Sequence, residues 1–292
     1  MTGFVSSYLP LVELAAFNAL LAYSQYIVLR AGVFSIATPA FAAVGAYAAA
    51  ILSVKLGLSP FVGVAAACVL GALLGGLLSL PLARLRGVFQ ALATLALVQV
   101  VMSIALSWTS VTEGALGING IPKAVGLEWF AVALLAVLYL MHAISISSIG
   151  RAFNVVGEDE TVAVSMGISV VRHHAIAFVL SGLLGSLAGA MHAYSSYSIT
   201  PNEYGFHMLT LVLAMVVLGG RVSIWGPLVG SLILTGLPEL LRGFENYRMV
   251  VQGAILMLAI VFLPAGIVDT AIRLYRNRKV AATGGVEKGA VS

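Results

Sequence analysis

Long apolar stretches with at most one charged side chain recur along the whole sequence, and they constrain the fold more than any motif does. A charged residue at the centre of a bilayer costs about 2.5–3.5 kcal/mol, so such runs of about 17–25 residues are candidate membrane helices. Nine candidates lie within residues 9–29, 32–54, 60–83, 87–109, 129–148, 173–195, 205–220, 224–240 and 249–268. The seventh and eighth are short and joined by GGRVSIWGP, so they could instead form a bent or partly re-entrant pair.

The overall composition supports the same class of protein. Only 9% of the 292 residues are charged, whereas soluble domains carry about a quarter. We therefore expect an all-α, polytopic membrane bundle of about nine transmembrane helices, in one transmembrane domain over residues 1–272. The Lys and Arg distribution predicts an outer N-terminus and a cytoplasmic C-terminus, with residues 273–292 as a basic cytoplasmic tail that we expect to be disordered.

The motifs of several chemistries are missing from the sequence. No G-x-x-x-x-G-K-[ST] loop is present, no second aspartate could face a first within the spans, and the five histidines lack H-E-x-x-H spacing. We therefore predict no catalytic residues, no metal site, no cofactor bound by this chain and no nucleic-acid partner. Ionisable residues are scarce inside the spans, which disfavours a proton-driven carrier. A channel remains, or a permease driven by another subunit.

One polar island interrupts the apolar pattern, at GRAFNVVGEDETVAVSMGI (150–168). Five charges from Arg151 to Arg172 would together cost on the order of 10 kcal/mol in lipid, so we expect a cytoplasmic loop over residues 148–172. Apolar residues recur there every four positions, at Val162, Met166 and Val170. This spacing predicts a short amphipathic helix whose apolar stripe could dock in a groove on a partner. An ordinary solvated loop is the alternative.

The island resembles the cytoplasmic coupling segment of ABC importer permeases, specifically the LivM-like family of branched-chain amino acid uptake systems. The matching positions are Gly150, Arg151, Ala152, Glu158, Asp159, Glu160, Ala163, Gly167 and Ile168. The sequence departs from the family at Asn154 and Gly157, where basic residues are common. Other segments are similar to family signatures in the same order: FSIATPAFAAVGAY, LRGVFQALATLAL, ITPNEYGF, MVVLGGRVSIWGPLVG, LPELL and FLPAGIV.

The resemblance implies a permease subunit in the inner membrane of a prokaryote, surrounded by lipid and moving branched-chain amino acids. Its implied partners are a second related permease, two cytoplasmic ATP-binding subunits that hold ATP and Mg, and an extracytoplasmic solute-binding protein. The residues that would couple this chain to the ATPase are Gly150, Arg151, Glu158, Asp159, Glu160, Ala163 and Gly167. Urea, short-chain amides, aromatic acids and sugars are alternative cargoes in related permeases, and a passive channel is an alternative of another class.

Three hydroxyl residues stand out in the apolar, family-like segments. Ser35, Thr38 and Thr94 are candidates to line a substrate path. The competing interpretation is that each hydroxyl bonds a carbonyl of its own helix, which is the commoner arrangement.

Overall fold

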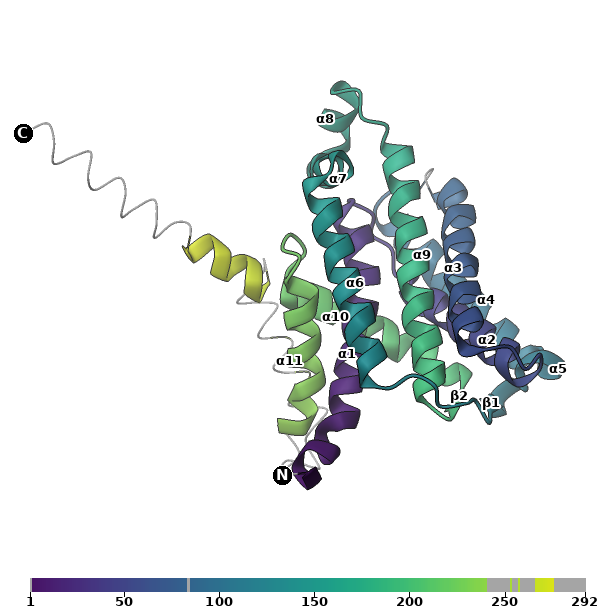
Figure 1. The fold of residues 1–292 in the computed structure, drawn as a ribbon. Coiled ribbons are helices and arrows are strands. Elements are labelled where there is room, and N and C mark those ends of the chain that lie inside the picture. Colours follow the sequence, from purple (N-terminus) through teal and green to yellow (C-terminus); the bar gives the residue numbers. More distant parts are fainter. Residues whose placement is uncertain (1, 83–84, 241–252, 254–256, 258–265, 276–292) are drawn as a thin grey trace, which may run out of the picture.

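The computed structural model describes residues 2–82, 85–240, 253, 257 and 266–275, and these residues are mostly helical (Figure 1). The longer helices are α1 (Thr2–Arg30), α2 (Thr38–Val54), α3 (Pro60–Leu82), α4 (Val88–Ser107), α6 (Leu127–Ile146), α9 (Val170–Ser195), α10 (Phe206–Gly219) and α11 (Gly226–Leu240). Shorter elements are α5 (Thr109–Thr112), η1 (Gly114–Leu116), β1 (Ile118–Asn119), α7 (Ser148–Glu158), α8 (Glu160–Ser165), β2 (Ser198–Ile199) and η2 (Pro201–Tyr204). The all-α prediction is thus confirmed, with one two-residue strand pair added.

Six segments of the described chain are long and apolar enough to cross a membrane. They are Leu9–Arg30, Pro60–Leu82, Val88–Ser107, Leu127–Ile146, Val170–Ser195 and Pro201–Gly219. The second and eighth predicted spans correspond to the shorter helices α2 and α11, and most of the ninth, 249–268, lies outside the described residues. The membrane bundle is therefore confirmed, while the count of nine stays a prediction.

Helices α1 and α9 form the centre of the bundle, and α3, α4 and α6 lie nearer its surface (Figure 1). Glycines allow a close approach between α3 and α9. A Cβ at Gly75 would collide with the carbonyl oxygen of Phe178, and one at Gly182 with the carbonyl oxygen of Gly71. In lipid, small residues at this spacing let helix backbones approach closely. The close packing of α3 on α9 therefore depends on these glycines.

The two ends of the bundle differ in structure. Helices α7 and α8 lie at one end, and the strand pair and the N-terminus lie at the opposite end (Figure 1). Ile118 pairs with Ile199 in the antiparallel strands, which joins the loop before α6 to the loop after α9. We call these the α7–α8 end and the strand end.

Candidate functional site

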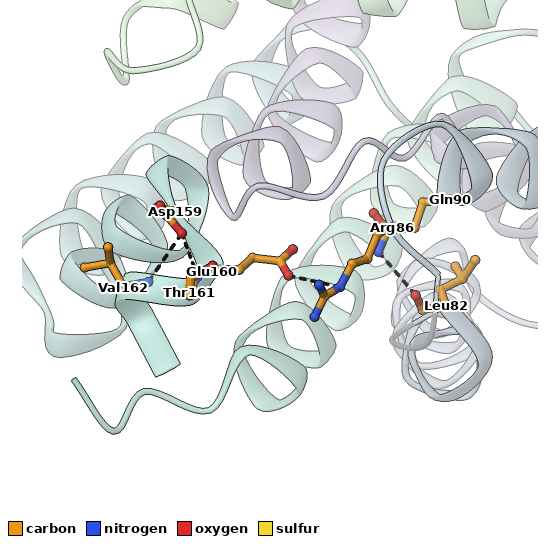
Figure 2. A network of polar contacts seen from close by, with 7 residues as sticks. All are labelled: Leu82, Arg86, Gln90, Asp159, Glu160, Thr161 and Val162. Atoms are coloured by element: carbon orange, nitrogen blue, oxygen red, sulfur yellow. Dashed lines mark hydrogen bonds and ion pairs between the residues drawn. The ribbon is translucent and has the colours of Figure 1, made fainter. Parts of the chain in front are cut away.

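The polar island folds as two short helices, each with a side-chain cap at its start. Ser147 Oγ accepts the backbone N–H of Gly150 at the start of α7, at 3.3 Å. Asp159 Oδ1 accepts the N–H groups of Thr161 at 2.7 Å and Val162 at 3.3 Å at the start of α8 (Figure 2). Both caps give an acceptor to backbone N–H groups that the start of a helix otherwise leaves unpaired. The N–H groups of Thr161 and Val162 also lower the pKa of the Asp159 carboxyl.

Helix α7 is amphipathic and buries one face in the bundle. Its buried residues are Gly150, Ala152, Phe153 and Val156. A Cβ at Gly150 would collide with the carbonyl oxygen of Ile144 in α6, so this position needs the close approach of two backbones. Phe153 also contacts His173 of α9 edge to face, with ring centroids 6.1 Å apart. The anchoring of α7 thus fixes where α8 begins.

Helix α8 differs from α7 because it leaves apolar side chains in the open. Ala163 is its buried residue, whereas Val162, Val164 and Met166 are exposed. The predicted stripe through Val162, Met166 and Val170 on a single helix is wrong. Helix α8 ends at Ser165, Gly167 adopts a φ of 78°, and the next helix begins at Val170. A left-handed residue of this kind terminates a helix, and glycine adopts it without steric cost.

A buried arginine ties this end of the bundle together. Arg30, at the end of α1, is only 8% exposed. Its guanidinium donates to Asn154 Oδ1 of α7 at 3.1 Å, to Ser145 Oγ of α6 at 3.1 Å and to the Tyr26 hydroxyl at 3.3 Å. None of these partners is charged, and the described part of the chain provides no carboxylate within ion-pair distance of Arg30. One cation therefore holds three helices through neutral acceptors.

The same network reaches the loop between α10 and α11. Tyr26 donates from its hydroxyl to the carbonyl oxygen of Val222 at 3.1 Å. The carboxylate of Asp269 accepts the N–H groups of Val222 and Ser223, both at 2.9 Å. Helix α7 is thus connected through Arg30 and Tyr26 to a loop distant in sequence.

A second polar contact joins α8 to the loop before α4. Arg86 Nε lies 3.4 Å from Glu160 Oε2, with side chains 85% and 31% exposed (Figure 2). Gln90 Nε2 donates to the carbonyl oxygen of Leu82 at 3.2 Å and closes this loop. An ion pair this exposed contributes about 0–1 kcal/mol to stability, so it orients α8 more than it holds the fold.

The structure divides the predicted coupling residues between the two helices. Gly150 and Arg151 lie in the first turn of α7, where Arg151 donates to the carbonyl oxygen of Ile146 at 3.0 Å. The acidic residues follow one another across the α7–α8 junction: Glu158 ends α7, Asp159 caps α8 and Glu160 begins it. Ala163 and Gly167 shape α8 and its end. Sequence reasoning missed Arg30 and Arg86, although each stands at the end of an apolar run.

The candidate path residues lie in a packed polar seam among α1, α2, α4 and α9. Ser35, Thr38 and Thr94 are all buried. Thr94 donates to the carbonyl oxygens of Gln90 and Ala91 in its own helix, at 2.9 and 3.0 Å. Thr38 instead donates to Gln25 Oε1 of α1 at 2.9 Å. Ser35 Oγ accepts the backbone N–H of Ala37 at 3.3 Å. All three hydroxyls are therefore hydrogen-bonded within the protein in this conformation, and their place on a path stays a prediction.

No metal centre emerges within the described ranges, where no three His, Cys, Asp or Glu side chains come together as ligands would. The arrangement can instead present a small polar and apolar surface, on α8 and the α7–α8 junction, attached firmly to the bundle behind it. Such a surface suits contact with another protein better than chemistry on a small molecule.

Comparison with known proteins gives consistent matches. Residues 8–260 match the family described as branched-chain amino acid transport system / permease component. The chain is 30% identical to the high-affinity branched-chain amino acid transport system permease protein LivM of Escherichia coli K12, over 84% of this chain and 65% of that protein. It is 28% identical to the ribose import permease protein RbsC of Escherichia coli K12, over 88% of this chain and 85% of that protein.

A third relative matches over a shorter stretch. The permease protein LivH of Escherichia coli K12 is 34% identical over 139 residues, which is 47% of this chain and 44% of that protein. The chain spans just under two thirds of the length of the LivM relatives, 65% in Escherichia coli and 61% in Salmonella typhimurium. No solved structure matches the chain significantly.

Proposed function

The chain belongs to the permease component family of branched-chain amino acid transport systems, and on that premise we propose that it forms the membrane path of an ATP-driven importer of leucine, isoleucine and valine. It is a multi-pass protein of the inner membrane. The observation that carries the proposal is the family match over residues 8–260, which includes the spans and the polar island. The relatives named for branched-chain amino acid transport support this cargo.

The proposed assembly contains two permeases, two cytoplasmic ATP-binding subunits and an extracytoplasmic solute-binding protein. ATP and Mg would be bound and hydrolysed by the partner subunits, and this chain would respond to their movement. We further propose nine spans within residues 1–272, with residues 273–292 as a cytoplasmic tail. The likeness to both LivM and LivH, two permease proteins of Escherichia coli K12, supports a second, related permease as the membrane partner.

The proposed contact with an ATP-binding subunit is the surface of α8 and the α7–α8 junction. Two observations support it. The exposed apolar residues Val162, Val164 and Met166 lie beside the acidic residues Glu158 and Glu160, so the surface offers both kinds of contact that interfaces use. The anchoring of α7 to α6 and α1 means that a push on α8 is passed to the bundle rather than absorbed by a loose loop.

A sugar importer is the second candidate, because the ribose permease relative is matched over 85% of its own length. Reconstitution of the complete transporter in proteoliposomes separates the two. We expect ATP-dependent uptake of labelled leucine, isoleucine and valine, with unlabelled ribose unable to compete. The matched control contains ATP-binding subunits that bind but do not hydrolyse ATP, and it should take up nothing. Uptake of leucine in that control would instead indicate a passive channel. ATP-dependent uptake of labelled ribose alone by the complete transporter would show that the cargo is a sugar.

A further inference from the structure

Helix α4 exposes a stripe of small and polar side chains along one face. Its members are exposed residues spaced three or four positions apart, which places them on one side of the helix: Ala96, Gln99, Ser103 and Ser107. The opposite side of α4 is buried, and there Val98 belongs to one apolar cluster with Ala40 of α2. We call the exposed set the α4 stripe.

Gln99 is the member of the α4 stripe that a lipid environment does not explain. Helix α4 runs from Val88 to Ser107, so at a rise of about 1.5 Å per residue Gln99 lies about 12 Å from the nearer end of this span. Its amide makes no hydrogen bond with any residue that the structure describes. Hydrocarbon offers neither donor nor acceptor, so an amide that faced lipid at this depth would stay unpaired.

The hydroxyl of Ser103 is in the same situation. Hydroxyls in helices commonly bond a carbonyl of the preceding turn, as Ser79 does to Gly76 and Thr94 does to Gln90. Ser103 has no such bond, nor any other hydrogen bond from its side chain within the described ranges. The α4 stripe therefore carries two polar groups in the middle of a span that need partners from outside this part of the chain.

The outer face of α3 is different, although α3 and α4 both lie near the surface of the bundle (Figure 1). Every side chain that α3 exposes is apolar, and the set includes Leu70, Leu73, Leu77 and Leu80. Such a face is suited to lipid tails. The α4 stripe instead combines small residues, which let helix backbones approach, with groups that can hydrogen-bond to another helix. This combination is typical of a helix contact inside a membrane.

We propose that the α4 stripe packs against the second permease of the transporter, with the Gln99 amide hydrogen-bonded across that interface. The inference rests on the proposed function, which supplies a second, related permease as the membrane partner. The other proposed partners are the ATP-binding subunits and the solute-binding protein, which lie outside the bilayer in that assembly. A membrane helix of the second permease brings side chains and carbonyl groups to the depth of Gln99, where lipid brings none.

Photo-cross-linking tests the contact directly. Val100 is 52% exposed and lies at the edge of the α4 stripe, so Val100→benzoylphenylalanine places a reactive group there without removing a polar side chain. The matched control is Leu73→benzoylphenylalanine, at a 64% exposed position on α3. The complete transporter in proteoliposomes is illuminated with the second permease tagged. We expect an adduct with the tagged permease from position 100, and adducts with lipid alone from position 73.

Replacing Gln99 tests the hydrogen bond. Gln99→Leu keeps the approximate size of the side chain and removes the amide, whereas Gln99→Asn keeps an amide and serves as the control. A polar bond between membrane helices is weak enough that we expect the dissociation constant for the second permease to rise roughly three- to thirtyfold in Gln99→Leu. The rise should be smaller in Gln99→Asn. The level of both variants in the membrane fraction should match wild type, because the amide has no partner in the described part of its own chain.

The outcomes separate this interface from the proposed function. If the second permease co-purifies with the wild-type chain while position 100 gives adducts with lipid alone or none, the interface is wrong and the assembly stands. An adduct within the chain itself, or with a second copy of it, would overturn the choice of partner. An unchanged dissociation constant in Gln99→Leu would overturn the role of the amide. If no second permease co-purifies with the wild-type chain, the proposed assembly fails and the interface fails with it.

Discussion

Replacing Arg30 tests whether one buried cation holds the α7–α8 end together. Two variants separate the charge of Arg30 from its hydrogen bonds. Arg30→Lys keeps the positive charge, but a lysine ammonium is a point donor that cannot span three acceptors on separate helices as the guanidinium fork does. Arg30→Met removes the charge and keeps a flexible apolar stem of similar length. Arg172→Met, at an exposed position in the first turn of α9, serves as the control.

The contacts of Arg30 predict the order of stability. Each hydrogen bond from a charged donor contributes about 1.5–3 kcal/mol, so a lysine that keeps one of three bonds loses about 3–6 kcal/mol before relaxation. Water at the exposed Asn154 offsets part of this loss and leaves about 2–4 kcal/mol. The methionine variant buries no charge, and Tyr26 keeps its 3.1 Å bond to Val222, so we expect a cost of about 1 kcal/mol.

Thermal unfolding of the purified variants checks this reasoning. The Tm should fall in the order wild type, Arg30→Met, Arg30→Lys, with the control close to wild type. Both Arg30 variants should also lose leucine uptake while the ATP-binding subunits continue to hydrolyse ATP, because α7 is no longer tied to α1 and α6. A lysine variant that unfolds at or above the Tm of the methionine variant would refute the claim that the three-way bonding keeps this charge buried.

Three further predictions concern the same half of the protein. Glu160→Lys should abolish uptake with little change in Tm, because its ion pair with Arg86 is exposed, and adding Arg86→Glu should restore the pair and part of the uptake; an unchanged rate in the single variant would contradict the coupling role. Asp159→Ala should speed hydrogen exchange in α8, and equal exchange in this variant and wild type would exclude the cap. Because the pKa of Asp159 is lowered in the folded protein, the stabilisation by the cap is present above the unfolded pKa near 3.8 and is lost only as pH falls through the folded pKa. Gly75→Leu should prevent accumulation in the membrane fraction because its Cβ would meet the Phe178 carbonyl oxygen, and a normal immunoblot signal would contradict this packing.

The sequence was sufficient for features that depend on neighbouring residues alone. Apolar runs of membrane length predicted spans that the structure forms as α1, α3, α4, α6, α9 and α10. The charges from Arg151 onward predicted that the island is separate from the long apolar helices, and it forms α7 and α8 at one end of the bundle. The helix boundary inside the island was not predicted, because the four-residue spacing of apolar side chains continues past Gly167. The helical conformation of the backbone ends there, since Gly167 has a positive φ.

Contacts between distant segments were beyond the reach of sequence patterns. Arg30 and Asn154 are 124 positions apart, and nothing local to either residue predicts that they meet. Thr38 could be recognised as polar from the sequence, yet only the packing of α2 against α1 decides that it donates to Gln25.

The physical reason is that hydropathy and helix formation are properties of a short window of chain, set by transfer free energies and by bonds four residues apart. They determined that this protein is a helical membrane bundle with one polar island. Which polar side chains face one another depends on how the helices cross and rotate, and close-packed side chains and glycine contacts along their whole length set that geometry. Only the tertiary structure could therefore decide that Arg30 holds α7 and that Arg86 meets Glu160.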